Sequence, residues 1–260
     1  MPELIIQRDG PIGRVIFSNP AKFNAMSRDM WEGVPKALAA FDADPQVRVI
    51  VLEGDGDKAF VSGADISQFE SQRSDPQAQA RYNAAVEAAY LAPIACSKPV
   101  VAKIRGICMG GGLGLAAACD LRLCRDDARF RMPAGRLGLG YNVAGVGRFL
   151  SVIGLQNTLD IFFSARIFDA ADALRMGFAS KVAPRERFDA MVDEWCQATA
   201  DNAPLTLRAL KLTVDALVRD PEQRDMDSVA AAIAACFASQ DYREGAAAFM
   251  EKRKPRFQGT

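Results

Sequence analysis

The stretch KPVVAKIRGICMGGGLGLAAACD, residues 98–120, decides the fold of this chain. Its apolar run 100–104 follows a proline and is typical of a buried β-strand. The glycine cluster 110–114 comes next and leads into the small apolar segment 115–119. Glycines between a strand and a helix let the backbone approach a ligand closely. We therefore predict a strand, a glycine loop and a short helix here, with the loop as a candidate site.

The glycine cluster fits neither of the common nucleotide-binding motifs. A Walker loop ends in Gly-Lys-Ser/Thr, whereas this cluster continues as Gly114-Leu115. Rossmann spacing from Gly110 and Gly112 requires a glycine at position 115, which is leucine. Two interpretations stay open: close packing of a helix on a strand, or a loop whose amides point at a developing negative charge.

Strands and helices alternate along the first two thirds of the chain. Apolar runs at 4–6 and 14–17 flank Asp9-Gly10 and predict a hairpin with a connection longer than two residues. Ser27 is the predicted cap of a helix, and the other predicted elements are strands at 47–52, 59–61 and 120–124, a surface loop at 66–76 and a helix at 77–96.

From about Pro184 the pattern is helical only. We predict helices at 186–201, 205–218, 226–239 and 241–252. This arrangement indicates an α/β core, residues 1–183, followed by a helical region, residues 184–260. The sequence has no clear internal repeat.

The composition gives no indication of a nucleic-acid-binding, membrane or disulfide-linked protein. The chain has 260 residues, with 32 basic and 32 acidic side chains. A net charge of zero predicts no electrostatic footprint for nucleic acid or a membrane surface. We find no apolar run of membrane-spanning length and no signal-peptide pattern, so we expect a cytoplasmic protein. The six cysteines form no CxxC pair, and we predict that they are small buried hydrophobic residues in a reducing compartment.

The absence of histidine excludes several kinds of catalytic site. A Ser-His-Asp triad, a histidine general base and a histidine-ligated zinc cannot be built from this chain. We therefore predict no metal site. Acid–base chemistry must come from Asp, Glu, Tyr, Lys, Cys or the backbone.

Four separated motifs resemble those of one family. Ala59–Ile66, AFVSGADI, resembles the AF-x-x-G-A-D-I segment of the enoyl-CoA hydratase/isomerase (crotonase) superfamily. The stretch 98–120 resembles its second signature, 23–26 its N-terminal turn, and 244–253 its C-terminal helix. The resemblance spans nearly the whole chain in the right order. It implies a crotonase spiral of ββα units with a C-terminal helical trimerisation region, assembled as a homotrimer or a homohexamer (a dimer of trimers).

The resemblance also implies a substrate and the residues that bind it. The substrate is an acyl-CoA thioester, with coenzyme A as part of the substrate and no separate cofactor. Backbone N–H groups of Ala64 and Gly111 would hold the thioester oxygen as it becomes an enolate. The implied CoA contacts are Lys22, Ser62, Ala64, Asp65, Ile66, Ser67, Phe249 and Lys252, of which Phe249 and Lys252 would come from a neighbouring subunit. For each lysine, a solvated surface charge is the alternative interpretation.

The sequence departs from the family pattern at the acid–base positions. Gly114 and Ala134 stand where typical hydratases carry glutamates, and Asn142 stands where some isomerases carry a carboxylate. Glycine and alanine can neither activate water nor protonate a carbanion. If the chain nevertheless hydrates its substrate, Glu70 and Asp75 are the first candidates for a substitute.

The pair Tyr141-Asn142 resembles the methylmalonyl-CoA decarboxylase branch, although that branch has histidine where this chain has Ala64. We therefore predict a non-standard reaction such as decarboxylation or hydrolysis, with Tyr141 as a third catalytic candidate. A packed aromatic ring is the alternative role for Tyr141. The alternatives for the whole protein are an atypical enoyl-CoA hydratase and a catalytically silent CoA-thioester-binding protein.

Overall fold

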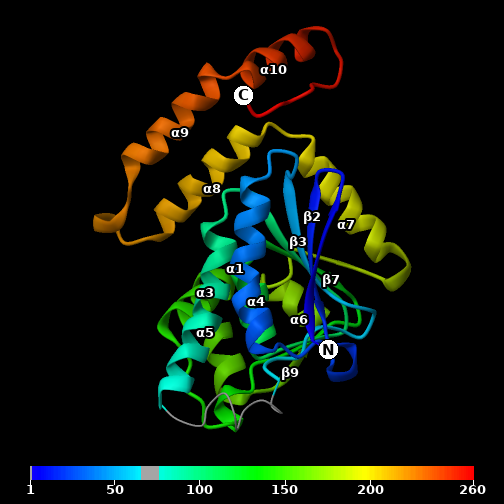
Figure 1. Ribbon diagram of the computed structural model, residues 1–260, viewed down its shortest axis with the longest axis vertical. Coiled ribbons are helices and arrows are strands. Elements are labelled where there is room, and N and C mark those ends of the chain that lie inside the picture. The colour runs from blue at the N-terminus through cyan, green and yellow to red at the C-terminus, as the bar shows by residue number, and fades with distance from the viewer. Residues whose placement is uncertain (1, 66–75) are drawn as a thin grey trace.

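The computed structural model describes residues 2–65 and 76–260 (Figure 1). It begins with an antiparallel hairpin of β1 (Glu3–Asp9) and β2 (Ile12–Ser18). Asp9 pairs with Ile12, so only Gly10 and Pro11 connect the strands. The prediction of a longer connection was wrong. Gly10 has a φ of 55°, in the left-handed region that glycine adopts without strain, and this allows the tighter turn.

Two sheets form the α/β core. The larger has the order β1-β2-β3-β5-β7-β10, and every pair from β2 to β10 is parallel. The smaller has the order β4-β6-β8-β9. The strand bounds are β3 (Val49–Gly54), β4 (Ala59–Val61), β5 (Val100–Ile104), β6 (Ile107–Met109), β7 (Leu121–Arg125), β8 (Arg129–Arg131), β9 (Ile167–Asp169) and β10 (Lys181–Ala183).

A ββα unit repeats three times through this core. Each unit places one strand in the larger sheet and the next in the smaller sheet, and then forms a helix. The units are β3-β4 with α3 (Pro76–Ala95), β5-β6 with α4 (Gly111–Ala118), and β7-β8 with α5 (Val143–Ser164). The repeat left no signal in the sequence because each strand of the smaller sheet is only 3 residues long.

The helix α1 (Arg28–Ala43) begins as predicted, with the Ser27 hydroxyl accepting a hydrogen bond from the Met30 amide at 3.3 Å. Its apolar face includes Met30, Val34, Leu38 and Phe41, all buried. It packs beside α3. This face of the larger sheet therefore carries the main hydrophobic core.

The opposite face of the larger sheet is covered by α7 (Arg185–Ala200). Phe188, Val192 and Cys196 of this helix pack on the alternate side chains of the strands, such as Val49 and Val101. Thus α7 shares a hydrophobic core with the strands, and the division of the chain at residues 183 and 184 stays a prediction.

The remaining helices end the chain as the sequence predicted. The short α6 (Ala170–Arg175) precedes β10, and α8 (Pro204–Val218), α9 (Met226–Ala238) and α10 (Gln240–Met250) follow α7. In Figure 1, α9 and α10 extend away from the sheets at the upper end of the molecule. None of the helices in the described part of the chain is long and apolar enough to cross a membrane.

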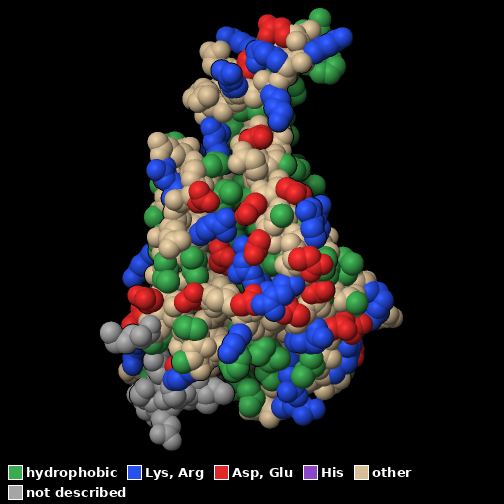
Figure 2. All heavy atoms as spheres, turned by 90° about the vertical axis from the view of Figure 1, so that its right-hand side faces the viewer, with side chains coloured by type: hydrophobic (Ala, Val, Ile, Leu, Met, Phe, Trp, Pro, Cys, Tyr) green, Lys and Arg blue, Asp and Glu red, His purple; other side chains and the backbone are tan. Residues whose placement is uncertain are grey.

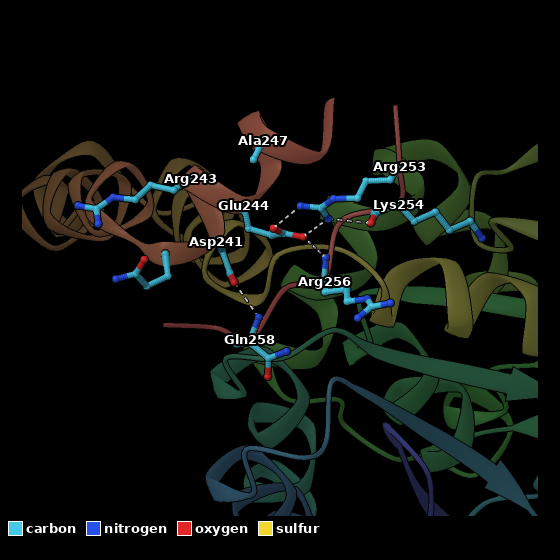
Figure 3. A pocket seen from close by; sticks show the side chains of 9 residues that line it. Asp241, Arg243, Glu244, Ala247, Arg253, Lys254, Arg256 and Gln258 are labelled. Atoms are coloured by element: carbon cyan, nitrogen blue, oxygen red, sulfur yellow. Dashed lines mark hydrogen bonds and ion pairs between the residues drawn. The ribbon is translucent and has the colours of Figure 1, made fainter. Parts of the chain in front are cut away.

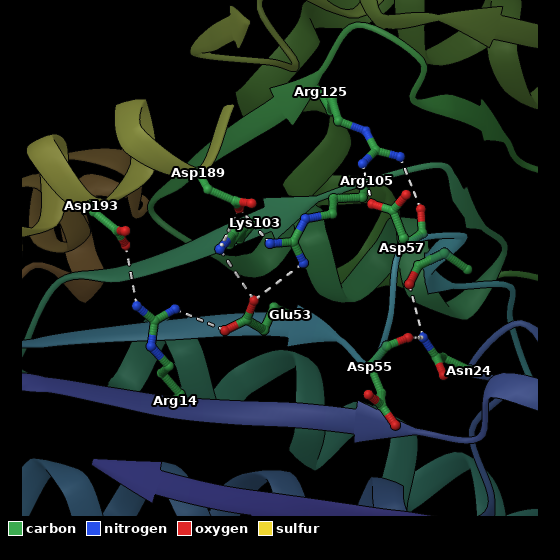
Figure 4. A network of polar contacts seen from close by, with 11 residues as sticks. Arg14, Asn24, Glu53, Asp55, Asp57, Lys103, Arg105, Arg125, Asp189 and Asp193 are labelled. Carbon is green, nitrogen blue, oxygen red and sulfur yellow. Dashed lines mark hydrogen bonds and ion pairs between the residues drawn. The ribbon is translucent and has the colours of Figure 1, made fainter. Parts of the chain in front are cut away.

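A network of ion pairs holds α7 to the sheet (Figure 4). The buried Glu53 carboxylate lies 2.9 Å from Arg14 and 3.5 Å from both Lys103 and Arg105. On α7, Asp189 lies 2.8 Å from Lys103, and Asp193 lies 3.2 Å from Arg14. Burial opposes ionisation of Asp189, but hydrogen bonds from Lys103 and Arg105 outweigh it and lower the pKa of that carboxyl to about 2.

The tail after α10 folds back onto that helix (Figure 3). Glu244 pairs with Arg253 at 2.6 Å, and Asp241 accepts hydrogen bonds from the amides of Gln258 and Gly259 at 2.7 and 2.8 Å. Basic and acidic side chains are interspersed on the face shown in Figure 2, so that neither sign gathers into one patch on the described part of that face.

Five of the cysteines are buried, and all six are free thiols. Burial raises the pKa of the Cys119 and Cys124 thiols to about 12. Such thiols are protonated at neutral pH and unreactive. The prediction of buried hydrophobic cysteines is confirmed for all but Cys236, which is partly exposed.

Candidate functional site

A cavity of about 390 Å³ opens between α1, α3, the glycine cluster and the loop before α5. It contains both glycine-containing turns singled out from the sequence. The residues that line it are Trp31, Ser62, Gly63, Ala64, Tyr82, Asn83, Val86, Glu87, Tyr90, Gly110, Gly111, Met132, Pro133, Ala134, Leu137, Leu139, Gly140, Tyr141 and Asn142.

The two turns touch each other through their glycines. Gly63 has a φ of 121° and Gly110 a φ of 51°, both in the region that favours glycine. A Cβ added to Gly110 would lie 3.9 Å from the Cα of Gly63. Ala64 follows the first glycine, and Gly111 follows the second as the first residue of α4. The chain therefore brings the two predicted oxyanion donors to the same cavity.

The amides of these two residues are available to a ligand. Around Ala64, the Met26 amide donates to Gly63 O at 2.8 Å and the Asp65 amide donates to Met26 O at 3.0 Å. In the part of the chain that the structure describes, neither Ala64 N–H nor Gly111 N–H has an acceptor. The Gly111 amide also lies at the N-terminus of α4, where unpaired amides and the helix dipole favour negative charge. The pair is suited to an oxygen that becomes negative.

Two tyrosine hydroxyls fill the space beside Gly114. A Cβ added to Gly114 would lie 2.5 Å from the hydroxyl oxygens of both Tyr90 and Tyr141, so any side chain there would displace these hydroxyls. The two hydroxyl oxygens are 3.3 Å apart, and the Tyr90 hydroxyl donates to Gly111 O at 3.1 Å. Tyr141 lines the cavity, and its catalytic role stays a prediction.

Tyr90 was missed by the sequence analysis. It lies in an alanine-rich helix, where an aromatic residue usually marks packing. Tyr82, Val86 and Tyr90 follow a spacing of four, which places them on one face of α3. This spacing, considered together with the glycine cluster, was the one feature of the sequence that could have identified Tyr90. It identifies a face and does not show what the face contacts.

Both phenols are neutral over the physiological range. Burial raises the pKa of Tyr90 well above its ordinary value, and the neighbouring Tyr141 raises it further. Burial also raises the pKa of Tyr141 to about 12, although its hydrogen bond with Tyr90 acts in the opposite direction. Neutral phenols donate hydrogen bonds and protons, and they do not act as bases at neutral pH.

The loop before α5 is held by its own asparagine. Asn142 lines the cavity, but its Oδ1 accepts a hydrogen bond from the Gly145 amide at 2.7 Å and caps α5. A Cβ on Gly145 would lie 2.5 Å from the Tyr141 ring, so this glycine lets the tyrosine pack. Ala134 is buried in the cavity wall.

Charged groups are nearly absent from the part of the cavity wall that the structure describes. Among its described residues, Glu87 is the only carboxylate, it is exposed, and no lysine or arginine is present. Sequence analysis did not single out Glu87. The candidates that it did name, Glu70 and Asp75, lie outside the described residues.

The other predicted CoA contacts fall in three places. Ser62 lines the cavity, whereas Asp65 is buried outside it and pairs with Lys22 at 2.9 Å. The Lys22 side chain is 47% exposed. Phe249 is 82% exposed on α10, and Lys252 follows that helix; neither lines the cavity. Ile66 and Ser67 lie outside the described residues. The CoA-binding roles of all these residues stay predictions.

Comparison with known proteins gives a consistent picture. The sequence model of the family described as "Enoyl-CoA hydratase/isomerase" matches residues 7–260. The chain is 33% identical to a peroxisomal Delta(3,5)-Delta(2,4)-dienoyl-CoA isomerase of Arabidopsis thaliana, over 96% of this chain and 93% of the isomerase. It is 30% identical to a crotonyl-CoA hydratase of Syntrophomonas wolfei, over 98% of this chain and 97% of the hydratase.

Solved structures agree with the sequence relatives. An enoyl-CoA hydratase/carnithine racemase from Magnetospirillum magneticum superposes with a TM-score of 0.93 at 32% identity, covering 99% of this chain and 96% of that one. An enoyl-CoA hydratase/isomerase family protein from Hyphomonas neptunium gives a TM-score of 0.91 at 32% identity, covering 98% and 97%.

Proposed function

Because the chain belongs to the enoyl-CoA hydratase/isomerase family and has its crotonase fold, we propose that it processes an acyl-CoA thioester through an enolate. The thioester oxygen is held by the amides of Ala64 and Gly111, which share one cavity and have no acceptor among the described residues. Coenzyme A enters as part of the substrate, and no separate cofactor is required.

The reaction that the cavity favours is decarboxylation of a malonyl-type thioester. The C–C bond to the carboxylate breaks, CO₂ leaves, and the bonding electron pair passes into the enolate at the two amides. No base is needed for this step. The neutral Tyr141 hydroxyl then protonates the α-carbon, and the phenolate recovers a proton from solvent.

The polarity of the wall favours the same reaction. The cavity offers no cation among its described residues to stabilise a substrate carboxylate. A carboxylate moved from water into such surroundings loses hydration, whereas CO₂ is neutral and does not. The ground state is therefore disfavoured relative to the products.

One observation carries this proposal: phenols occupy the space beside Gly114, and the only carboxylate among the described residues of the wall is the exposed Glu87. The test is to incubate the protein with crotonyl-, malonyl-, methylmalonyl- and β-ketoacyl-CoA and to follow the products by mass spectrometry. We expect loss of CO₂ from a malonyl-type thioester. Release of free coenzyme A instead would identify hydrolysis, and no product from any thioester would favour a silent binding protein.

A second candidate, an atypical hydratase, rests on Glu87. This carboxylate is exposed and lines the cavity, and a carboxylate is a group that can activate water as a general base. Hydration of crotonyl-CoA that is lost in Glu87→Gln would support this alternative. Decarboxylation that survives Glu87→Gln would support the first proposal.

We also propose that the chain forms a homotrimer or a homohexamer in the cytoplasm. Large apolar side chains are exposed along α8, α9 and α10, among them Leu210, Phe237, Phe249 and Met250. Such side chains are more commonly covered in an assembly. Sedimentation velocity gives the mass of the assembly, and a monomer at micromolar concentration would contradict this proposal.

A further inference from the structure

We propose that Tyr90 is a positioning residue, which fixes Gly111 through its hydroxyl and directs the proton of Tyr141. This inference rests on the proposed function and names a residue that acts through two members of the site. Tyr90 is 6% exposed on α3, and its hydroxyl lies between Gly111 and Tyr141.

The direction of the hydrogen bonds follows from the chemistry of the three groups. A carbonyl oxygen can only accept, so the single proton of Tyr90 goes to Gly111 O at 3.1 Å. The Tyr90 oxygen is then an acceptor toward Tyr141, whose hydroxyl oxygen is 3.3 Å away. In this chain of hydrogen bonds Tyr141 is the donor, and its proton is held at the inner wall of the cavity.

The same arrangement of hydroxyls stabilises Tyr141 after it has given up its proton. Once Tyr141 has protonated the substrate, its oxygen is a phenolate and needs a donor. The Tyr90 hydroxyl can turn from Gly111 O to this phenolate without moving its ring, because a phenol proton rotates about the C–O bond. The effect of Tyr90 on the pKa of Tyr141 has the matching sign, since its hydrogen bond favours the ionised form.

The surroundings hold Tyr90 in this place. Its ring meets the Trp31 ring edge to face, with centroids 6.0 Å apart, and the Trp31 indole N–H donates to the Tyr82 hydroxyl at 3.1 Å. On the other side, Gly114 leaves the space in which the two hydroxyls meet. Gly114 is thus required for the pair of hydroxyls.

The test compares Tyr90→Phe, Tyr141→Phe and the double variant, with Tyr242→Phe as the matched control. Tyr242 is 56% exposed on α10, does not line the cavity, and loses the same atom. For Tyr90→Phe we expect kcat to fall about tenfold or more, with KM within about twofold. Because the two tyrosines act as a unit, the double variant is expected to be no slower than Tyr141→Phe alone.

A second readout does not depend on turnover. The infrared carbonyl stretch of ¹³C-labelled acetyl-CoA reports how strongly the amides of Ala64 and Gly111 polarise the bound thioester. We expect a downshift in the wild type, a smaller downshift in Tyr90→Phe because Gly111 is less firmly held, and the wild-type downshift in Tyr141→Phe. A purely packing role for Tyr90 predicts wild-type values in both variants.

Gly114→Ala disturbs the pair of tyrosine hydroxyls from α4, and it replaces Tyr90→Phe in the test if that variant does not fold. Its Cβ would force the two hydroxyls apart, so the same loss of kcat is expected. Wild-type kcat and a wild-type carbonyl shift in Tyr90→Phe, or in Gly114→Ala where that variant replaces it, would overturn the role of Tyr90. A wild-type protein that binds acetyl-CoA with no downshift would instead overturn the proposed function, and the role of Tyr90 with it.

Discussion

The cavity and the ion-pair network beneath α7 differ in the charge of their buried polar groups. In the network, Glu53 meets three cations and Asp189 meets two of the same cations. In the cavity, the polar groups that meet beside Gly114 are the neutral phenols of Tyr90 and Tyr141. A permanent buried charge requires partners, so the network is saturated before anything binds. A site that stabilises a charge formed only during the reaction is better served by amides and neutral donors.

The largest effect should come from removing one amide of the cavity. Gly111→Pro deletes the N–H at the first position of α4, where helices tolerate proline. We expect kcat to fall about 10²–10³-fold, since one oxyanion donor is worth about 3–4 kcal/mol. Steady-state kinetics on the true substrate provides the measurement.

Gly111→Ala is the control for that substitution. It keeps the amide and adds only a Cβ, which would lie 2.9 Å from Trp31. The loss in Gly111→Pro should exceed the loss in Gly111→Ala by at least tenfold. Equal losses would show that crowding against Trp31, and not the missing donor, is responsible.

Substitutions in the ion-pair network should lower the stability of the protein and leave its turnover unchanged. Glu53→Gln removes the carboxylate that pairs with Arg14, Lys103 and Arg105, and it leaves Lys103, only 6% exposed, with Asp189 alone. We expect a loss of about 3 kcal/mol in the free energy of unfolding. Urea denaturation measures this, and the exposed pair of Arg219 and Asp215 gives the control, since Asp215→Asn should cost less than about 1 kcal/mol.

Tyr141→Phe, in contrast, should lower turnover and leave the stability of the protein unchanged. Its ring packs against Phe149 and Phe162, with centroids 6.4 and 5.2 Å away, and phenylalanine keeps both contacts. We expect kcat to fall about tenfold or more, equal to about 1.4 kcal/mol of barrier, with unfolding little changed. An unaltered kcat on the true substrate would leave Tyr141 with packing as its only role.

The smallest predicted effect is a pH dependence in the network. The folded pKa of Asp189, about 2, lies below its ordinary value of 3.8, so its contribution to stability is complete above that value and is lost as the pH falls toward 2. Because its side chain is 62% exposed, we expect about 1 kcal/mol or less. The difference in unfolding free energy between wild type and Asp189→Asn should therefore shrink between pH 5 and pH 2. A constant difference would contradict this assignment.

Sequence reasoning was strongest where the signal is local. The Ser27 cap and the four helices after Pro184 depend on contacts within a few residues, and the structure confirms them. The hairpin connection was predicted too long because strand pairing extends to Asp9 and Ile12, beyond the apolar runs that defined the strands. Pairing depends on the partner strand, and a pattern in one strand does not report it.

The sequence by itself determined the family, the two glycine turns and the loss of acid–base carboxylates at Gly114 and Ala134, because each is a matter of residue type at a position. Only the tertiary structure decided what replaces them. Tyr90 and Tyr141 are 51 residues apart and meet beside Gly114 because α3, α4 and the loop before α5 converge there. Periodicity shows which face of a helix is buried, but the partner of that face is chosen by the packing of the whole chain.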